Sequence, residues 1–146
     1  QAVFSGFSAT AGATVPALAT SYEAEAPANT LAGGAVVSAC STCSGGAKVG
    51  FVGNGGTLTF GRISVPSAGT YRVTLVYCSG DPRPAMVSAN GGPPQALSFP
   101  STGSFNTTGT LTVSLPLNAG NNTIQLGDPT AYTPDFDRII VAASPG

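Results

Sequence analysis

The sequence is poor in charge and contains neither histidine nor tryptophan. Charged residues make up 8% of its 146 residues, against roughly 25% in an average soluble domain. The absence of histidine excludes a Ser-His-Asp triad. So few ionisable groups also leave little with which to tune the pKa of a catalytic acid or base. Catalysis is therefore disfavoured from the composition alone.

Two kinds of partner are also excluded by what is missing. The formal net charge is −1 and the chain has no run of basic residues, so nothing would neutralise nucleic-acid phosphates. No apolar stretch approaches the roughly 20 residues that a membrane-spanning helix needs. We therefore expect neither nucleic acid nor membrane as a partner.

Turn-forming residues and short alternating segments dominate instead. The chain has 20 Gly and 12 Pro, and apolar residues alternate with polar ones in the clearest segments, which indicates strands. Turn residues separate these segments, as in SGDPRP and NAGNN. The predicted strands cover residues 57–60, 62–65, 69–77, 85–90, 95–99, 109–117, 122–126 and 136–142. Short strands with this spacing predict an all-β fold, a β-sandwich of the jelly-roll type.

The first 20 residues differ from the rest of the chain. They carry no charge and show no clear periodicity, so we interpret residues 1–20 as a linker or the end of an upstream domain. Residues 21–146 then form the folded module of a larger parent protein. Low charge and two N-glycosylation sequons, Asn106-Thr107-Thr108 and Asn121-Asn122-Thr123, favour a secreted protein, although chance alone can also produce such sequons.

The three cysteines predict one small disulfide. Cys40 and Cys43 form a CxxC motif in a Ser- and Gly-rich segment, and Cys78 ends a predicted strand. Zinc would need further Cys or His ligands, and a thioredoxin-like pair would need a βαβ context. A Cys40–Cys43 disulfide is the favoured interpretation, with Cys78 as a buried free thiol. A bridge from Cys78 to the loop remains the alternative.

Four of the six acidic residues form two pairs with the same spacing. Glu23 and Glu25 lie in YEAE, and Asp135 and Asp137 lie in PDFD. Residues i and i+2 of a strand share a face, so paired strands would gather these carboxylates. Such a group could serve as glycosidase-like catalytic acids or as oxygen ligands for Ca²⁺. Otherwise one acid pairs with Arg138 and the others are solvated.

An ordered set of motifs resembles a known family. YEAE, CSTCSGGAKVGFVGNGG, SAGTYRVTLVY, an NGG turn, SFPSTGSFNTTGTLTVSLPLNAGNNTIQL and PDFDRI follow one another between residues 22 and 141. In this order they resemble carbohydrate-binding module family 35 and its relative, family 6. The resemblance implies a jelly roll with one structural calcium ion, held by Glu23, Glu25 and Asp137 and by main-chain carbonyls of the SGGAKVG loop.

The same resemblance implies a sugar site in the loops at one end of the sandwich. Its candidate residues are Asp81, Arg83, Tyr132 and Asp135. An aromatic ring covers the apolar side of a sugar ring, and charged groups strengthen hydrogen bonds to its hydroxyls. Each residue also has a simpler role: Asp81 and Arg83 can pair with each other, and Tyr132 can pack over a loop.

The expected function is therefore a non-catalytic module that holds a parent glycoside hydrolase on polysaccharide. By analogy the ligand is a galactose-containing glycan such as β-1,3-galactan, and the module is a tethered monomer. Other candidates are uronic-acid or mannan-type glycans, a calcium-stabilised adhesion or structural domain, and a small hydrolase.

Overall fold

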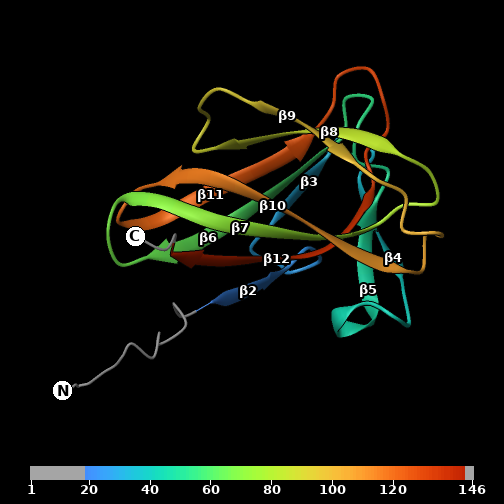
Figure 1. The fold of residues 1–146 in the computed structure, drawn as a ribbon, viewed down its shortest axis with the longest axis horizontal. Helices are drawn as coiled ribbons and strands as arrows, with labels where there is room; N and C mark the ends of the chain where they lie inside the picture. Colours follow the sequence, from blue (N-terminus) through green and yellow to red (C-terminus); the bar gives the residue numbers. More distant parts are fainter. Residues whose placement is uncertain (1–18, 144–146) are drawn as a thin grey trace.

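The protein is a β-sandwich of two antiparallel sheets. The structure, a computed structural model, describes residues 19–143, and all the strand pairs within this range are antiparallel. The six-stranded sheet has the order β10 (Thr108–Leu117), β7 (Gly69–Cys78), β12 (Asp135–Ala143), β5 (Ala47–Gly50) and β4 (Val36–Ala39), with β2 (Thr20–Glu23) beside β12. The five-stranded sheet has the order β3 (Thr30–Ala32), β6 (Thr57–Val65), β11 (Gly120–Gly127), β8 (Arg83–Ala89) and β9 (Gln95–Phe99). The predicted jelly-roll class is confirmed (Figure 1).

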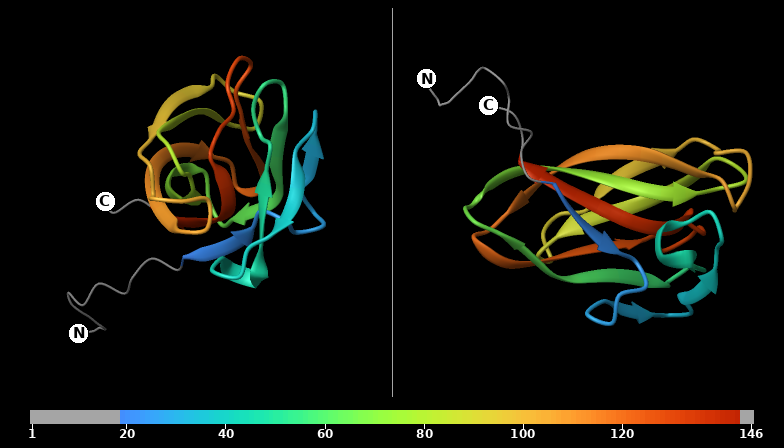
Figure 2. Two further views of the ribbon diagram at one scale, coloured as in Figure 1. Left: turned by 90° about the vertical axis from the view of Figure 1, so that its right-hand side faces the viewer. Right: turned by 90° about the horizontal axis from the view of Figure 1, so that it is seen from below.

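The apolar residues of the alternating strands form the core between the two sheets. On β7, the alternating residues Tyr71, Val73, Leu75 and Tyr77 are buried. Three phenylalanines, Phe60, Phe99 and Phe136, are among the largest fully buried side chains. Burying a side chain of this size is worth about 1.5–3 kcal/mol, so these residues are major contributors to stability. Figure 2 shows the two layers from the side and from the end.

One strand prediction was wrong, and three short strands were missed. Residues 57–60 and 62–65 are one strand, β6, rather than two. The register against β11 shifts between Asn122 and Ile124, and Arg62 has a φ of 57°; this irregularity is a β-bulge, which inserts an extra residue without ending the strand. Strands β3, β4 and β5 were not predicted, because they are only three or four residues long and β4 and β5 lie among glycines.

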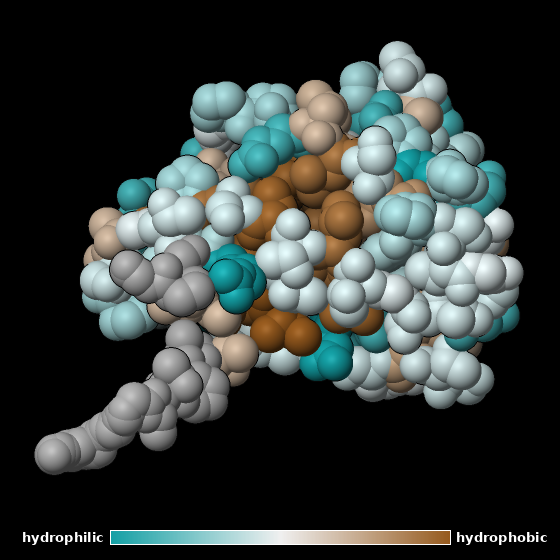
Figure 3. All heavy atoms as spheres, viewed as in Figure 1, coloured by the Kyte–Doolittle hydropathy of each residue, from teal (hydrophilic) through white to brown (hydrophobic). Residues whose placement is uncertain are grey.

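The surface reflects the low charge of the sequence. On the face drawn in Figure 3, residues of intermediate hydropathy predominate and apolar side chains gather in the middle, over β7 and β10. Within the described residues, no helix is long and apolar enough to cross a membrane. In the part of the chain that the structure describes, strands predominate and one short 3₁₀ turn, η1, lies at Ser44–Gly46.

The two ends of the described chain lie side by side. Thr20 of β2 pairs with Val141 of β12, so the chain enters and leaves this part of the domain at the same end of the six-stranded sheet. Strand β2 begins at Thr20, one residue before the predicted module boundary. The rest of the predicted linker, residues 1–18, lies outside the described residues, and its assignment stays a prediction.

Candidate functional site

Two loops pack against each other at the end of the sandwich where β12 begins, and together they form a double loop. We use this name for residues 51–56 together with residues 128–134. Gly53 forms an isolated bridge to Tyr132, and the Asn54 N–H donates to the Ala131 carbonyl at 3.0 Å. A Cβ atom on Gly53 would lie 2.2 Å from the Ala131 carbonyl oxygen. Only glycine therefore permits the two loops to approach this closely.

One side of the double loop borders a pocket of about 260 Å³. The residues that line it come from both sheets and from three loops: Ser38, Gly50, Phe51, Arg83, Phe105, Tyr132 and Asp135. Strand β12 supplies Asp135 at its first residue, and β8 supplies Arg83 at its first residue. Both charged side chains stand where a strand emerges from a loop, so their backbones are fixed by the sheets.

Both charged residues of the pocket are ion-paired. Lys48 Nζ lies 2.8 Å from Asp135 Oδ2, and this pair is largely buried. Lys48 Nζ also donates to the Phe105 carbonyl. Arg83 Nε lies 2.8 Å from Asp81 Oδ1, while its Nη1 donates to the Thr133 carbonyl at 3.2 Å. The pocket thus offers oriented donors and acceptors and is close to neutral in charge.

Two exposed aromatic rings border the pocket. Phe51 is 61% exposed and Tyr132 is 46% exposed, and their ring centroids lie 6.1 Å apart in an edge-to-face arrangement. Phe51 has a φ of 56°, a left-handed conformation that is rare for a bulky residue and costs about 1–2 kcal/mol. Backbone strain of this kind clusters at binding and catalytic sites. A strained, solvent-exposed phenylalanine at a pocket edge therefore suits ligand contact better than packing.

Three of the four predicted ligand residues lie together in this pocket. Arg83, Tyr132 and Asp135 line the pocket, whereas Asp81 is 61% exposed and reaches it only through its pair with Arg83. The pairing of Asp81 with Arg83 is the simpler role that the sequence also allowed.

Sequence reasoning missed five other residues of this site: Ser38, Lys48, Gly50, Phe51 and Phe105. The one available signal was Phe51, an apolar residue directly after Gly50 in a loop-like segment.

A cluster of three carboxylates lies on the side of the six-stranded sheet where β2 joins β12. Ser44 links two of them, because its N–H donates to Asp137 Oδ2 at 3.0 Å and its hydroxyl to Glu23 Oε2 at 2.6 Å. A Cβ atom on Gly45 would lie 2.8 Å from Glu25 Oε2 and 3.1 Å from Glu23 Oε1. Turn η1 therefore closes directly over the acids that the sequence proposed as metal ligands.

The acids converge in a different way from the one that the sequence predicted. Strand β2 ends at Glu23, so Glu25 lies in the following turn and does not share a strand face with it. The register of β12 against β7 shifts between Phe136 and Arg138, which makes Asp137 the extra residue of a bulge. The same-face argument was therefore wrong for Glu23 and Glu25, and the turn and the bulge bring Glu25 and Asp137 to Glu23, while Asp135 lies apart in the pocket.

These residues fit a calcium ion. Glu23 Oε1, Glu25 Oε1 and Asp137 Oδ1 are buried oxygens that have no hydrogen-bond partner among the described residues. Burial raises the pKa of Asp137, and the charge of Glu23 adds to the effect. Burial also raises the pKa of Glu25, helped by its contacts with Glu23. Unpartnered, mutually repelling carboxylate oxygens are the hard ligands that Ca²⁺ prefers.

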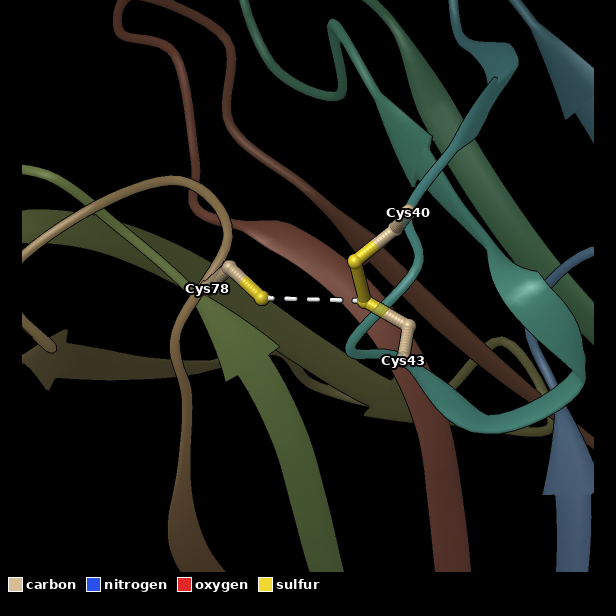
Figure 4. A group of neighbouring side chains, drawn as sticks. All are labelled: Cys40, Cys43 and Cys78. Carbon is tan, nitrogen blue, oxygen red and sulfur yellow. Dashed lines mark hydrogen bonds between the residues drawn. A yellow bond between two sulfur atoms is a disulfide. The ribbon is translucent and has the colours of Figure 1, made fainter.

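The three cysteines form a compact buried group (Figure 4). Cys40 and Cys43 form the predicted disulfide, and Cys78 is a free, fully buried thiol whose sulfur lies 3.9 Å from that of Cys43. The three sulfurs are close enough to suggest a metal site. However, two of them form the disulfide, so the group is a buried contact between Cys78 of β7 and the loop before η1.

The Cys78 thiol is expected to resist alkylation in the folded protein. Burial raises its pKa, and only the thiolate reacts with iodoacetamide. At pH 8 the native protein should gain no adduct over an hour, whereas protein in guanidinium chloride should gain one, as measured by intact mass. One adduct on the native protein would contradict the buried position of Cys78.

Comparison with solved structures places the fold in a family. A family 35 carbohydrate-binding module from Clostridium thermocellum superposes with a TM-score of 0.83 at 41% identity, over 85% of this chain and 98% of that one. A family 35 module from Paenibacillus barcinonensis gives 0.78 at 29% identity, over 86% and 99%. An exo-β-1,3-galactanase from Phanerochaete chrysosporium, solved with galactose, gives 0.80 at 37% identity over 86% of this chain and 29% of the galactanase.

No family model matches the sequence, and no curated protein matches it. The family assignment therefore rests on the solved structures. This chain is 41% identical to the Clostridium thermocellum module and covers 98% of it. The chain belongs to carbohydrate-binding module family 35. It is a carbohydrate-binding module and not an enzyme, which confirms the expectation from its few ionisable groups.

Proposed function

We propose that the pocket beside the double loop binds a neutral, galactose-containing glycan such as β-1,3-galactan. The module then holds a secreted parent glycoside hydrolase on its polysaccharide, and the carboxylate cluster carries one structural Ca²⁺. The observation that carries the ligand proposal is the combination of two exposed rings with ion-paired Arg83 and Asp135 in one pocket.

The pocket chemistry suits galactose. The axial 4-hydroxyl of galactose leaves the C–H groups at C3, C4 and C5 on one face, and such a face packs against an aromatic ring. Tyr132 and Phe51 offer two rings in an edge-to-face arrangement, with an interplanar angle of 78°. Asp135 can accept hydrogen bonds from hydroxyl groups and Arg83 can donate to them, and charged partners make these bonds stronger than neutral ones.

A neutral sugar suits the site better than a uronic acid. A uronate carboxylate needs an unpaired cation or a bound metal to offset its desolvation. In the described part of the chain, the two cations at the pocket, Lys48 and Arg83, are already paired with Asp135 and Asp81. The related galactanase, solved with galactose, supports the same ligand class.

The placement of the pocket suits a tethered module. Asp135 is the first residue of β12, whereas the pairing of Thr20 with Val141 lies six residues further along that strand, about 20 Å away at roughly 3.3 Å per residue. A tether at Thr20 therefore leaves the pocket free. Holding an enzyme on its substrate raises the effective substrate concentration without any new catalytic contact.

Affinity electrophoresis against a set of soluble polysaccharides tests the proposal. The gels should contain β-1,3-galactan, arabinogalactan, mannan, polygalacturonate or no polysaccharide, each with 1 mM CaCl₂. We expect retardation by the galactose-containing polymers alone. Retardation by polygalacturonate or mannan alone would assign another sugar, and free migration in every gel would favour an adhesion or structural role.

A further inference from the structure

The two N-glycosylation sequons lie at opposite ends of the sandwich. Asn106 precedes β10 by two residues, and Asn121 lies in β11, just after the turn that follows β10. Strand β10 has ten residues, so the two asparagines are separated by about 30 Å at roughly 3.3 Å per residue. Both asparagines are exposed, as are the threonines two residues later, Thr108 and Thr123.

Asn106 lies in an exposed turn whose main chain is held from several sides. Its N–H donates to Ser104 Oγ at 3.1 Å, and its carbonyl accepts a hydrogen bond from the Thr42 hydroxyl. The Thr107 N–H donates to the Ser104 carbonyl at 3.4 Å. A substituent on the side-chain amide would therefore extend into solvent without disturbing these contacts.

The same turn forms one edge of the pocket. Phe105, directly before Asn106, lines the pocket. The Arg83 guanidinium carbon lies 4.6 Å from the centre of the Phe105 ring, and Lys48 donates to the Phe105 carbonyl. A bulky group on Asn106 would therefore begin one residue from the pocket wall. A group on Asn121 would lie at the far end of the sandwich.

We propose that Asn106 is an N-glycosylation site and that its glycan restricts which ligands reach the pocket. The donor is a lipid-pyrophosphate-linked oligosaccharide, used by the transferase of a eukaryotic secretory pathway. A bond forms between Asn106 Nδ2 and the anomeric carbon, the bond from that carbon to the pyrophosphate breaks, the amide loses one proton, and the lipid pyrophosphate leaves. The glycan shields one edge of the pocket, so short oligosaccharides and chain ends enter more easily than branched polymer. The effect on ligands rests on the proposed sugar binding, whereas the modification rests only on secretion of the protein.

Secretion of the protein from yeast tests the modification. Wild type, Asn106→Gln, Thr108→Ala and the matched control Asn121→Gln are compared by intact mass and peptide mapping, before and after peptide N-glycosidase. Asn106 should carry a glycan in wild type and in Asn121→Gln, and both sequon variants at this turn should lack it. An unmodified Asn106 in secreted wild type overturns the proposal.

Binding measurements on the same proteins test the restriction. Relative to glycosylated wild type, Asn106→Gln and Thr108→Ala should bind branched arabinogalactan roughly threefold or more tightly, because a bulky surface glycan is removed. Their affinity for β-1,3-galactobiose should change less than twofold. Equal polymer affinity with and without the glycan overturns the restriction. Absence of all sugar binding refutes the proposed function and with it the restriction, while the mass data still decide the modification.

Discussion

Removing calcium is expected to lower the melting temperature of the module by about 10 °C or more. A ligand at 1,000 times its dissociation constant stabilises the folded state by about 4 kcal/mol, and 1 kcal/mol shifts the melting temperature of a domain of this size by roughly 3–5 °C. The physical reason is the group formed by Glu23, Glu25 and Asp137, which buries three carboxylate oxygens that have no hydrogen-bond partner within residues 19–143. Differential scanning calorimetry in 1 mM CaCl₂ and in EDTA measures the shift.

The variant Asp137→Asn tests whether Asp137 is a metal ligand or an acid with only a structural role. The variant keeps the shape of the side chain and an acceptor for the Ser44 N–H, but it removes one charge from the cluster. Its calcium-dependent shift should fall to a small fraction of that of wild type, while in EDTA it should be at least as stable as wild type. Asp81→Asn, an exposed acid elsewhere, is the control and should keep the full shift. A wild-type melting curve that is the same in CaCl₂ and in EDTA would contradict the calcium proposal.

Tyr132→Ala is expected to lower the affinity for β-1,3-galactooligosaccharides by roughly 30-fold, since a central aromatic contact is typically worth about 2 kcal/mol or more in a binding site. The ring is 46% exposed, so its removal should cost little stability. Isothermal titration calorimetry gives the affinity, and thermal melting gives the stability. Gln125→Ala is the matched control, because Gln125 lies in a separate cavity on the five-stranded sheet.

Phe51→Gly should give a distinct pair of effects. It removes an exposed ring and also relieves a left-handed backbone conformation, φ 56°, that glycine adopts freely. The affinity should therefore fall while the melting temperature stays level or rises. Unchanged affinity in both Phe51→Gly and Tyr132→Ala would place the sugar elsewhere on the module.

Asp135 is a poor choice for such a test, because its loss would leave Lys48 buried without its ion partner. Removing one member of a buried pair costs about 3–5 kcal/mol. A change in binding for an Asp135 variant could then reflect a disturbed fold.

The sequence predicted the fold class because its long strands alternate regularly. Strands such as β7 and β10 bury one face, so Tyr71 and Leu115 could be assigned to the core from the pattern alone. The short strands β4 and β5 have no such pattern, since Gly-rich segments with three or four paired residues do not show a period of two. Pairing with longer neighbours stabilises them, and that information is absent from the local sequence.

The candidate site was predictable only in part for a related reason. The resemblance to family 35 predicted Arg83, Tyr132 and Asp135 as ligand residues, and these three line one pocket. Lys48 and Phe105 join them through contacts between residues 57 positions apart, and no local pattern reports such a contact. The bulge at Asp137 was equally invisible, because a bulge depends on the register against β7.

Titration of ¹⁵N-labelled module with β-1,3-galactobiose in CaCl₂, followed by NMR, tests whether the pocket beside the double loop binds galactose. We expect the amide signals of Gly50, Phe51, Phe105, Tyr132 and Asp135 to shift with a single dissociation constant, while those of Gln125 and Gly127, in the other cavity, stay in place. Saturable shifts confined to that second cavity, or no shifts at millimolar sugar, would contradict it.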